Sequence, residues 1–269
     1  MDYTLGFIGC GNMGGALVRA AARTVDPEKI AVSGHNAAKA QALADACGVH
    51  IEDNAEIARR CDYIFLGVKP QMMENMLAGI KRELAKRKTP PVLVTMAAGL
   101  SMESICAMAG GEYPVIRIMP NTPVAVGRGM TLCCSNDRVS SEQLDEALSA
   151  LKETGWIALI DEGQIDAGSA VSGCGPAFAY MFIEALADGG VMCGLPRNLA
   201  LTFAAQTLAG AAELMLSTGR HPGMLKDEVC SPGGSTIAGV HALESRAFRS
   251  ACIDAVNAAF EKTKQLGQK

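Results

Sequence analysis

Aromatic residues are scarce in this 269-residue sequence, at 4%, with a single tryptophan. Hydrophobic residues still make up 49% of the chain, so alanine, glycine, leucine and methionine must supply most of the packing. A chain of this length can build two domains, each with its own core.

A surplus of positive charge is also missing. The net charge is −4 and the pI is about 5.6, so we expect neither nucleic acid nor an anionic membrane as a partner. No segment is apolar and uncharged for the roughly 18 residues that a membrane span needs. The N-terminus lacks a basic region followed by a cleavable apolar stretch. We therefore expect a cytoplasmic protein.

Metal-ligand spacing is absent as well. The ten cysteines are scattered, without a C-x-x-C pair and without a histidine at a suitable distance. This pattern predicts no metal site and indicates reduced, mostly buried thiols.

The most informative stretch that is present lies at the N-terminus. Residues 5–8 are an apolar run typical of a buried strand, and Gly9, Gly11 and Gly14 follow as G-x-G-x-x-G before apolar residues at helical spacing. In a strand–turn–helix unit these glycines permit the tight turn, the approach of a pyrophosphate and close helix–strand packing. The stretch predicts a dinucleotide site.

The end of the second expected strand (residues 30–33) indicates which dinucleotide binds. An acid there would favour NAD, but the chain has Ser33, His35 and Asn36, with Lys39 one helical turn later. These groups can donate to a phosphate, so NADP(H) is preferred, and NAD(H) is the second choice. The alternative is a solvated loop without a role in selectivity.

Further strands are expected at residues 49–51, 63–68, 91–96, 115–119, 130–134 and 156–160. They alternate with helices at 37–46 and 71–87 and with a helix that opens at Ser140, where Gln143 completes a capping box. Alternating strands and helices predict an α/β fold with a doubly wound, mostly parallel sheet over residues 1–162. Residues 68–70 and 97–99 follow strands at the edge where ligands bind. Pro120 and Pro123 form a stiff turn that should fix the Asn121 side chain there.

From residue 163 to 269 the strand signals stop, and we expect an all-helical domain. Helices are expected from Pro176 to about Gly194, from Pro196, as the first helical residue, to about 217, and over about 248–264. Residues 177–193 carry only Glu184 and Asp188 as charged groups. A helix that is apolar almost all round must be buried, so we expect a homodimer through this half.

Two glycine-rich motifs punctuate these helices, at residues 172–177 (SGCGPA) and 231–236 (SPGGST). Both should present free backbone N–H groups and hydroxyls at a helix start, which suits a carboxylate or phosphate. Singly, each is more typical of a plain helix cap; together they favour an anionic substrate.

Taken together, the motifs resemble one family, the pyrroline-5-carboxylate reductases. The resemblance rests on G-x-G-x-M-G at 9–14, V-K-P at 68–70, R-x-M-P-N-T-P at 117–123, and the motifs at 172–177 and 231–236. It implies a Rossmann domain, a helical dimerisation domain, and NAD(P)H-dependent reduction of 1-pyrroline-5-carboxylate to L-proline. It also implies a dimer that assembles further, to a decamer in some members.

Carried over by motif, the resemblance implies two sets of site residues. The cofactor set, joined by Ser33, His35 and Asn36 from the strand argument, comprises Ile8, Gly9, Cys10, Gly11, Asn12, Met13, Asn54, Gly67, Val68, Lys69, Pro70, Met96, Ala97 and Ala98. The substrate set comprises Asn121, Ser172, Gly233, Gly234, Ser235 and Thr236, with the Thr236 hydroxyl as the catalytic group that meets the ring nitrogen. Cys174 stands where the family usually has serine.

Two other classes of protein share parts of this pattern. The β-hydroxyacid dehydrogenases have a similar opening but place a catalytic lysine on the first long helix of their second domain, and residues 170–195 contain no lysine. A non-catalytic NADP-binding sensor on the same fold stays open, although it gives no reason to retain two substrate loops. Cys174 and Cys230 are interpreted as packing residues.

Overall fold

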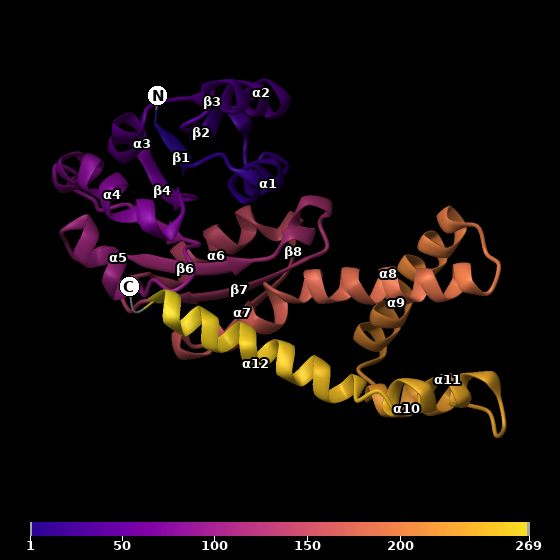
Figure 1. Cartoon of the computed structure of the whole chain (residues 1–269). Coiled ribbons are helices and arrows are strands. Elements are labelled where there is room, and N and C mark those ends of the chain that lie inside the picture. Colours follow the sequence, from indigo (N-terminus) through magenta and orange to yellow (C-terminus); the bar gives the residue numbers. More distant parts are fainter. Residues whose placement is uncertain (1, 268–269) are drawn as a thin grey trace. The chain divides into compact units, whose positions relative to one another are not determined.

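The structure is a computed structural model that describes residues 2–267. The first part of the chain forms one sheet from strands β1 (Tyr3–Ile8), β2 (Ile30–Ser33), β3 (His50–Ile51), β4 (Cys61–Leu66), β5 (Val92–Thr95), β6 (Val115–Pro120), β7 (Gly129–Ser135) and β8 (Gly155–Leu159). Their order in space is β3-β2-β1-β4-β5-β6-β7-β8 (Figure 1). Neighbours are parallel except for β6 and β7. The predicted doubly wound, mostly parallel sheet is confirmed.

The antiparallel pair follows from a short connection. Only residues 121–128 join β6 to β7, and they contain the 3₁₀ helix η2 (Thr122–Val126). A parallel crossover needs a dozen residues or more, so this connection can only return the chain alongside itself.

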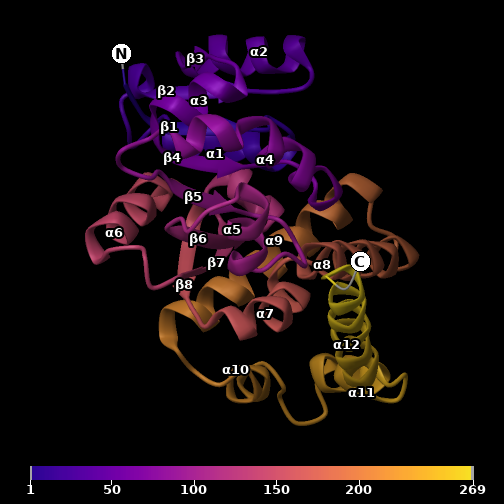
Figure 2. The ribbon, with the colours of Figure 1, turned by 90° about the vertical axis from the view of Figure 1, so that its left-hand side faces the viewer.

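Helices cover both faces of the sheet (Figure 2). On one face α3 (Asn54–Arg60), α4 (Pro70–Ala85), α5 (Met102–Ala109) and α7 (Ile165–Ser172) pack against the strands. On the other face lie α1 (Asn12–Ala21), α2 (Ala37–Cys47) and α6 (Ser141–Ala150). The capping box at the start of α6 is confirmed, because the Ser140 side chain accepts from Gln143 N and the Gln143 side chain accepts from Ser140 N.

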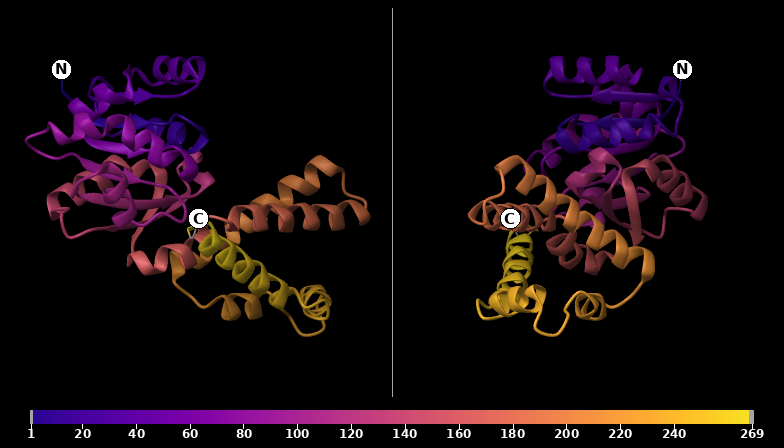
Figure 3. Two further views of the ribbon diagram at one scale, coloured as in Figure 1. Left: turned by 60° about the vertical axis from the view of Figure 1, so that its left-hand side comes forward. Right: turned by 90° about the vertical axis from the view of Figure 1, so that its right-hand side faces the viewer.

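Helices make up the rest of the chain: α8 (Gly175–Met192), α9 (Arg197–Thr218), α10 (Pro222–Glu228), α11 (Ser235–Glu244) and α12 (Phe248–Gly267). Helices α8 and α9 pack side by side through alanines 187, 200 and 204 (Figure 3). The expectation that Pro196 is the first helical residue is wrong. Its ψ of 139° is extended, and it is the N-cap of α9.

The chain divides into two compact units. Residues up to Cys174 and those from Ala259 onward form the sheet unit, and Gly175–Ala258 forms the helical unit. The expected domain boundary between residues 162 and 163 stays a prediction.

The expectation that no segment is apolar enough for a membrane span is wrong. Two helical segments, 162–192 and 197–218, are long and apolar enough to cross a membrane, because a few charged residues do not lower their hydropathy below that of a span. Length and composition do not distinguish such a span from a helix that another protein chain covers.

Candidate active site

The glycine turn after β1 is built by contacts of backbone with backbone. Gly9 has a φ of +106°, and its N–H donates to Ser33 O at 2.9 Å. A Cβ on Gly14 would lie 2.1 Å from Gly9 O, and one on Gly9 would lie 2.6 Å from the Gly67 carbonyl. The fold itself therefore requires glycine at these positions.

Gly11 is different. A Cβ there would meet no protein atom within 4 Å, so the packing of the described chain does not need glycine. Gly11 is also the N-cap of α1 and supplies no side-chain cap. The first N–H groups of a helix lack partners inside it and attract anions. Open space beside these amides is what the pyrophosphate of a dinucleotide needs.

The end of β2 carries the residues that are predicted to select the dinucleotide. Ser33 is 7% exposed, and its hydroxyl donates to Asn54 Oδ1, 21 residues further along the chain. Asn36 Oδ1 caps α2 by accepting from Lys39 N at 3.0 Å. Ser33 and Asn36 therefore already have partners, while His35 and Lys39 are exposed and reach solvent. The structure brings Ser33 and Asn54 together, which their sequence separation gave no reason to expect.

Further residues that are predicted to contact the cofactor follow β4 and β5. Lys69 is exposed and is the N-cap of α4, with Pro70 as the first helical residue. Val68 and Ala98 pack partly against the core, and Ala97 is buried in it. Gly67 N donates to Ile8 O at 2.7 Å. The predicted cofactor residues thus follow the carboxyl ends of the neighbouring strands β2, β1, β4 and β5, and Asn54 joins them from the start of α3, after β3.

Asn121 and Ser172, both predicted to lie near the substrate, are in contact. The Asn121 Nδ2 group donates to Ser172 O at 2.9 Å, and Asn121 Oδ1 accepts from Met130 N at 2.9 Å. The Ser172 hydroxyl donates to Gly168 O at 3.0 Å within its own helix. The Asn121 side chain and the Ser172 carbonyl therefore tie the turn after β6 to the end of α7.

The motif at 172–177 opens helix α8, which begins at Gly175, but its first residues belong to the end of another helix. Helix α7, which the sequence analysis did not predict, precedes it, and Gly173 N and Cys174 N both donate to Ser169 O, at 2.8 and 3.1 Å. The expectation of free amides at these two residues is wrong, because the last turn of α7 uses them.

The motif at 231–236 keeps its open helix start. Gly233 has a φ of +70°, and Gly234 is the N-cap of α11 without a side-chain cap. A Cβ on Gly234 would lie 2.5 Å from Ser231 Oγ. Ser235 and Thr236 are exposed at the first turn. Because no side chain caps α11, the amides at its start can bind a carboxylate.

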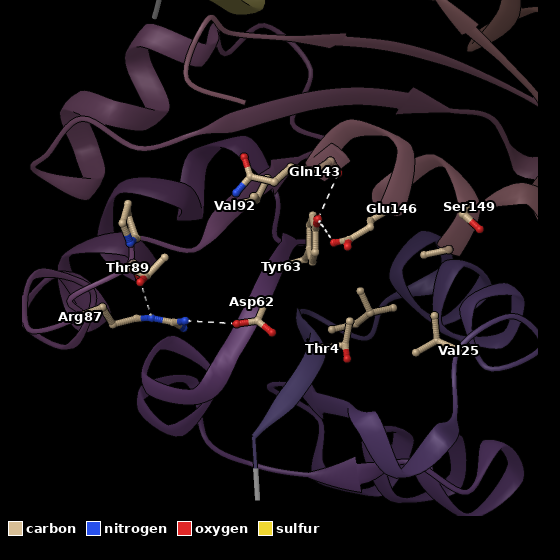
Figure 4. A pocket seen from close by; sticks show the side chains of 13 residues that line it. Thr4, Val25, Asp62, Tyr63, Arg87, Thr89, Val92, Gln143, Glu146 and Ser149 are labelled. Carbon is tan, nitrogen blue, oxygen red and sulfur yellow. Dashed lines mark hydrogen bonds and ion pairs between the residues drawn. The ribbon is translucent and has the colours of Figure 1, made fainter. Parts of the chain in front are cut away.

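A cavity of about 550 Å³ lies at the opposite edge of the sheet, at the amino ends of β1, β4 and β5 (Figure 4). Its polar groups satisfy one another. The Tyr63 hydroxyl donates to Glu146 Oε2 at 2.5 Å, and burial together with this bond raises the pKa of Tyr63. Arg87 Nε donates to Thr89 O at 3.2 Å. Tyr63, Glu146 and Arg87 therefore already have partners within the protein.

Metal and thiol chemistry find no support in the described residues. Within 2–267 no group of three or more His, Cys, Asp or Glu side chains is placed to hold a metal ion. Cys10 lies in the glycine turn, where burial raises its pKa to about 11. It is therefore a neutral thiol at physiological pH and a poor nucleophile.

Comparisons with known proteins agree with this geometry. A family model described as pyrroline-5-carboxylate reductase dimerisation matches residues 162–266, and one described as NADP oxidoreductase, coenzyme F420-dependent, matches residues 4–99.

Among individual proteins, the chain is 41% identical to the pyrroline-5-carboxylate reductase of Synechocystis sp. over 272 residues, covering 100% of both chains. It is also 41% identical to that of Escherichia coli over 271 residues, again covering 100% of both. A solved structure of Plasmodium falciparum pyrroline carboxylate reductase with NADP bound is 34% identical, with a TM-score of 0.86 over 99% of this chain and 98% of that one. Similarity of this extent shows that the chain belongs to the pyrroline-5-carboxylate reductase family.

Proposed function

We propose that the protein reduces 1-pyrroline-5-carboxylate to L-proline, the final step of proline biosynthesis, with NADPH as the preferred hydride donor and NADH as an alternative. A nicotinamide cofactor supplies the hydride, which adds to the imine carbon while the ring nitrogen retains its proton. The observation that carries the proposal is the full-length 41% identity to enzymes of this name.

The sheet unit holds the cofactor in this proposal. The open amides after Gly11 bind the pyrophosphate, and the Ser33–Asn54 pair with exposed His35 and Lys39 faces the ribose phosphate. The remaining contacts come from the loops after β1, β4 and β5, at residues Ile8, Gly9, Cys10, Asn12, Met13, Asn36, Gly67, Val68, Lys69, Pro70, Met96, Ala97 and Ala98.

The substrate binds at the start of α11. The amides of Gly233 and Ser235 hold its carboxylate, while the Gly234 amide donates to Ser231 O at 3.0 Å and keeps the loop in shape. The Thr236 hydroxyl meets the ring nitrogen, where charge changes during hydride transfer. A protonated cyclic imine is already electrophilic, so the protein mainly positions it and excludes water. The hydrogen bond from the Asn121 side chain to Ser172 O fixes these two residues next to the substrate.

The chain associates with itself through the segment that matches the dimerisation model, residues 162–266. We extend this to a homodimer that can assemble to a decamer, located in the cytoplasm, without membrane or nucleic-acid partners. In that assembly the apolar helices 162–192 and 197–218 are covered by protein rather than lipid. Residues 1–162 form the Rossmann domain and 163–269 the substrate and dimerisation domain.

The test is NADPH oxidation followed with the five-membered pyrroline carboxylate and the six-membered piperideine carboxylate side by side. We expect faster turnover of the five-membered imine and L-proline as its product. Activity with neither imine contradicts the proposal. Equal rates contradict the choice of substrate.

A further inference from the structure

One arginine is buried between two parts of the predicted site. We propose that Arg117 is a positioning residue that fixes two parts of the site relative to each other. These are the loop before α5, on the cofactor side, and helix α7, on the substrate side. The inference rests on the proposed function. Arg117 contacts neither ligand in this proposal and acts through two carboxylates.

The arginine lies in β6, and its side chain is 5% exposed. Nη1 approaches Glu162 Oε1 at 3.3 Å, and Nη2 approaches Asp166 Oδ1 at 3.1 Å. A buried guanidinium needs partners in good geometry, because removal from water is costly. Its planar fork sets the direction of both carboxylates in a way that a lysine cannot reproduce.

Glu162 carries the link to the cofactor side. Its Oε1 atom also accepts from Met102 N at 2.7 Å, and Met102 is the first residue of α5. The loop that leads into α5 contains Met96, Ala97 and Ala98, which are predicted to contact the cofactor. One carboxylate oxygen therefore joins this helix start to Arg117.

Asp166 carries the link to the substrate side. It lies in the first turn of α7, whose last residue is Ser172, and Ser172 O accepts from Asn121 Nδ2. Arg117 on β6 and Asn121, the residue directly after β6, lie four residues apart, about 13 Å at a strand's rise. Asp166 and Ser172 lie six residues apart on α7, about 9 Å at a helix's rise. Helix α7 is thus held alongside β6 at both ends.

These contacts avoid the phosphate-binding side of the site. The glycine turn and the Ser33–Asn54 pair belong to β1, β2 and α3 and share no hydrogen bond with Arg117 in the described chain. Loss of Arg117 should therefore release α5 and α7 while leaving cofactor affinity nearly intact. General destabilisation would impair both.

Four variants test this. Arg117→Met removes the fork, Arg117→Lys keeps only the charge, and Arg117→Met with Glu162→Gln and Asp166→Asn leaves no unpaired carboxylate. Asp166→Asn alone is a mild change at a partly exposed side chain. The matched control is Arg138→Met, which breaks the exposed ion pair with Glu112 on the same unit. Each protein is measured for Tm, NADPH Kd by fluorescence, and kcat and KM for the imine.

We expect the Met variant and the triple variant to lose about 10- to 100-fold in kcat/KM for the imine, with NADPH Kd within about threefold of wild type. The Lys variant should recover part of this loss, and Arg138→Met should behave as wild type. If neither Met variant folds, Asp166→Asn decides, with a smaller loss of the same pattern.

Wild-type kinetics in any folded variant that lacks the Asp166 contact overturn the inference. A parallel loss of cofactor affinity and imine turnover also overturns it, because that result indicates a structural role alone. An inactive wild-type enzyme contradicts the proposed function instead, so the two failures are distinguishable.

Discussion

The sheet unit and the helical unit are both rich in apolar residues but place them differently. In the sheet unit, large side chains such as Phe7, Phe65 and Leu77 are fully buried. In the helical unit the buried core consists of alanines 187, 200 and 204, while Phe203 and Met181 lie exposed on the single chain. The sheet unit completes its core within one chain, whereas the helical unit has apolar surface left for a second copy.

The largest effect is expected from a charge placed on the exposed apolar surface of the helical unit, because that surface is proposed to form the dimer interface. Phe203 is 53% exposed, so Phe203→Glu should be tolerated by a lone chain. In a dimer, truncating a central aromatic anchor costs about 2 kcal/mol or more, and a buried charge adds to that. We expect loss of the dimer and of activity, measured by light scattering and NADPH oxidation.

The matched control is Val126→Glu, at a side chain 76% exposed on the sheet unit, which should leave assembly unchanged. An intact Phe203→Glu dimer would show that this face of α9 is not the interface.

The second test separates the roles of the two units in the reaction. Thr236 does not cap α11, so Thr236→Ala should barely change Tm. Loss of a contact made in the transition state should lower kcat/KM for the imine by about 10- to 1,000-fold with unchanged NADPH affinity. Thr202→Ala, whose hydroxyl donates to Asn198 O on α9, is the control. Near-wild-type turnover of Thr236→Ala would leave the backbone amides as the whole substrate site.

The third test concerns cofactor binding by the sheet unit. Gly11→Ala meets no protein atom, so it should fold normally but weaken NADPH binding by about tenfold, which is about 1.4 kcal/mol. Gly14→Ala places a Cβ 2.1 Å from Gly9 O, and such overpacking costs about 1–3 kcal/mol of stability. Fluorescence titration and thermal unfolding measure the two effects. Unchanged affinity in Gly11→Ala would move the pyrophosphate away from this turn.

The smallest effect concerns the choice of cofactor. Ser33→Asp puts a carboxylate beside Asn54, where it repels the 2′-phosphate of NADPH and accepts from the ribose of NADH. We expect the ratio of kcat/KM for NADPH to that for NADH to fall by about tenfold or more. Ser33→Ala, which loses the bond to Asn54 without adding charge, should change the ratio much less. A wild-type preference for NADH would end this interpretation of residues 33–39.

Much of the sheet unit could be predicted from the sequence. Strand β2 has the predicted bounds, and β4 to β8 differ from prediction by one or two residues at most ends, because apolar runs bounded by turn residues are a local signal. The short helices α5, α7 and α10 were missed, since segments of seven or eight residues carry little periodicity.

Contacts between distant residues could not be predicted at all. The Asn121–Ser172 bond spans 51 residues and the Arg117–Asp166 pair spans 49. The partners of each side chain depend on how α7 lies against β6, which no local pattern records. Asn121 was therefore expected to face the substrate, and its bonds to Ser172 O and Met130 N emerged only from the fold.

The return of the chain end to the sheet unit has a consequence for synthesis on the ribosome. Residues from Ala259 onward belong to the unit that begins at the N-terminus. Domains generally fold as they emerge, N-terminal first, yet this unit gains its last helical segment only after the whole helical unit has been synthesised. The apolar helical insertion, Gly175–Ala258, leaves the ribosome before that moment, so a nascent chain exposes it while its neighbouring unit is still unfinished.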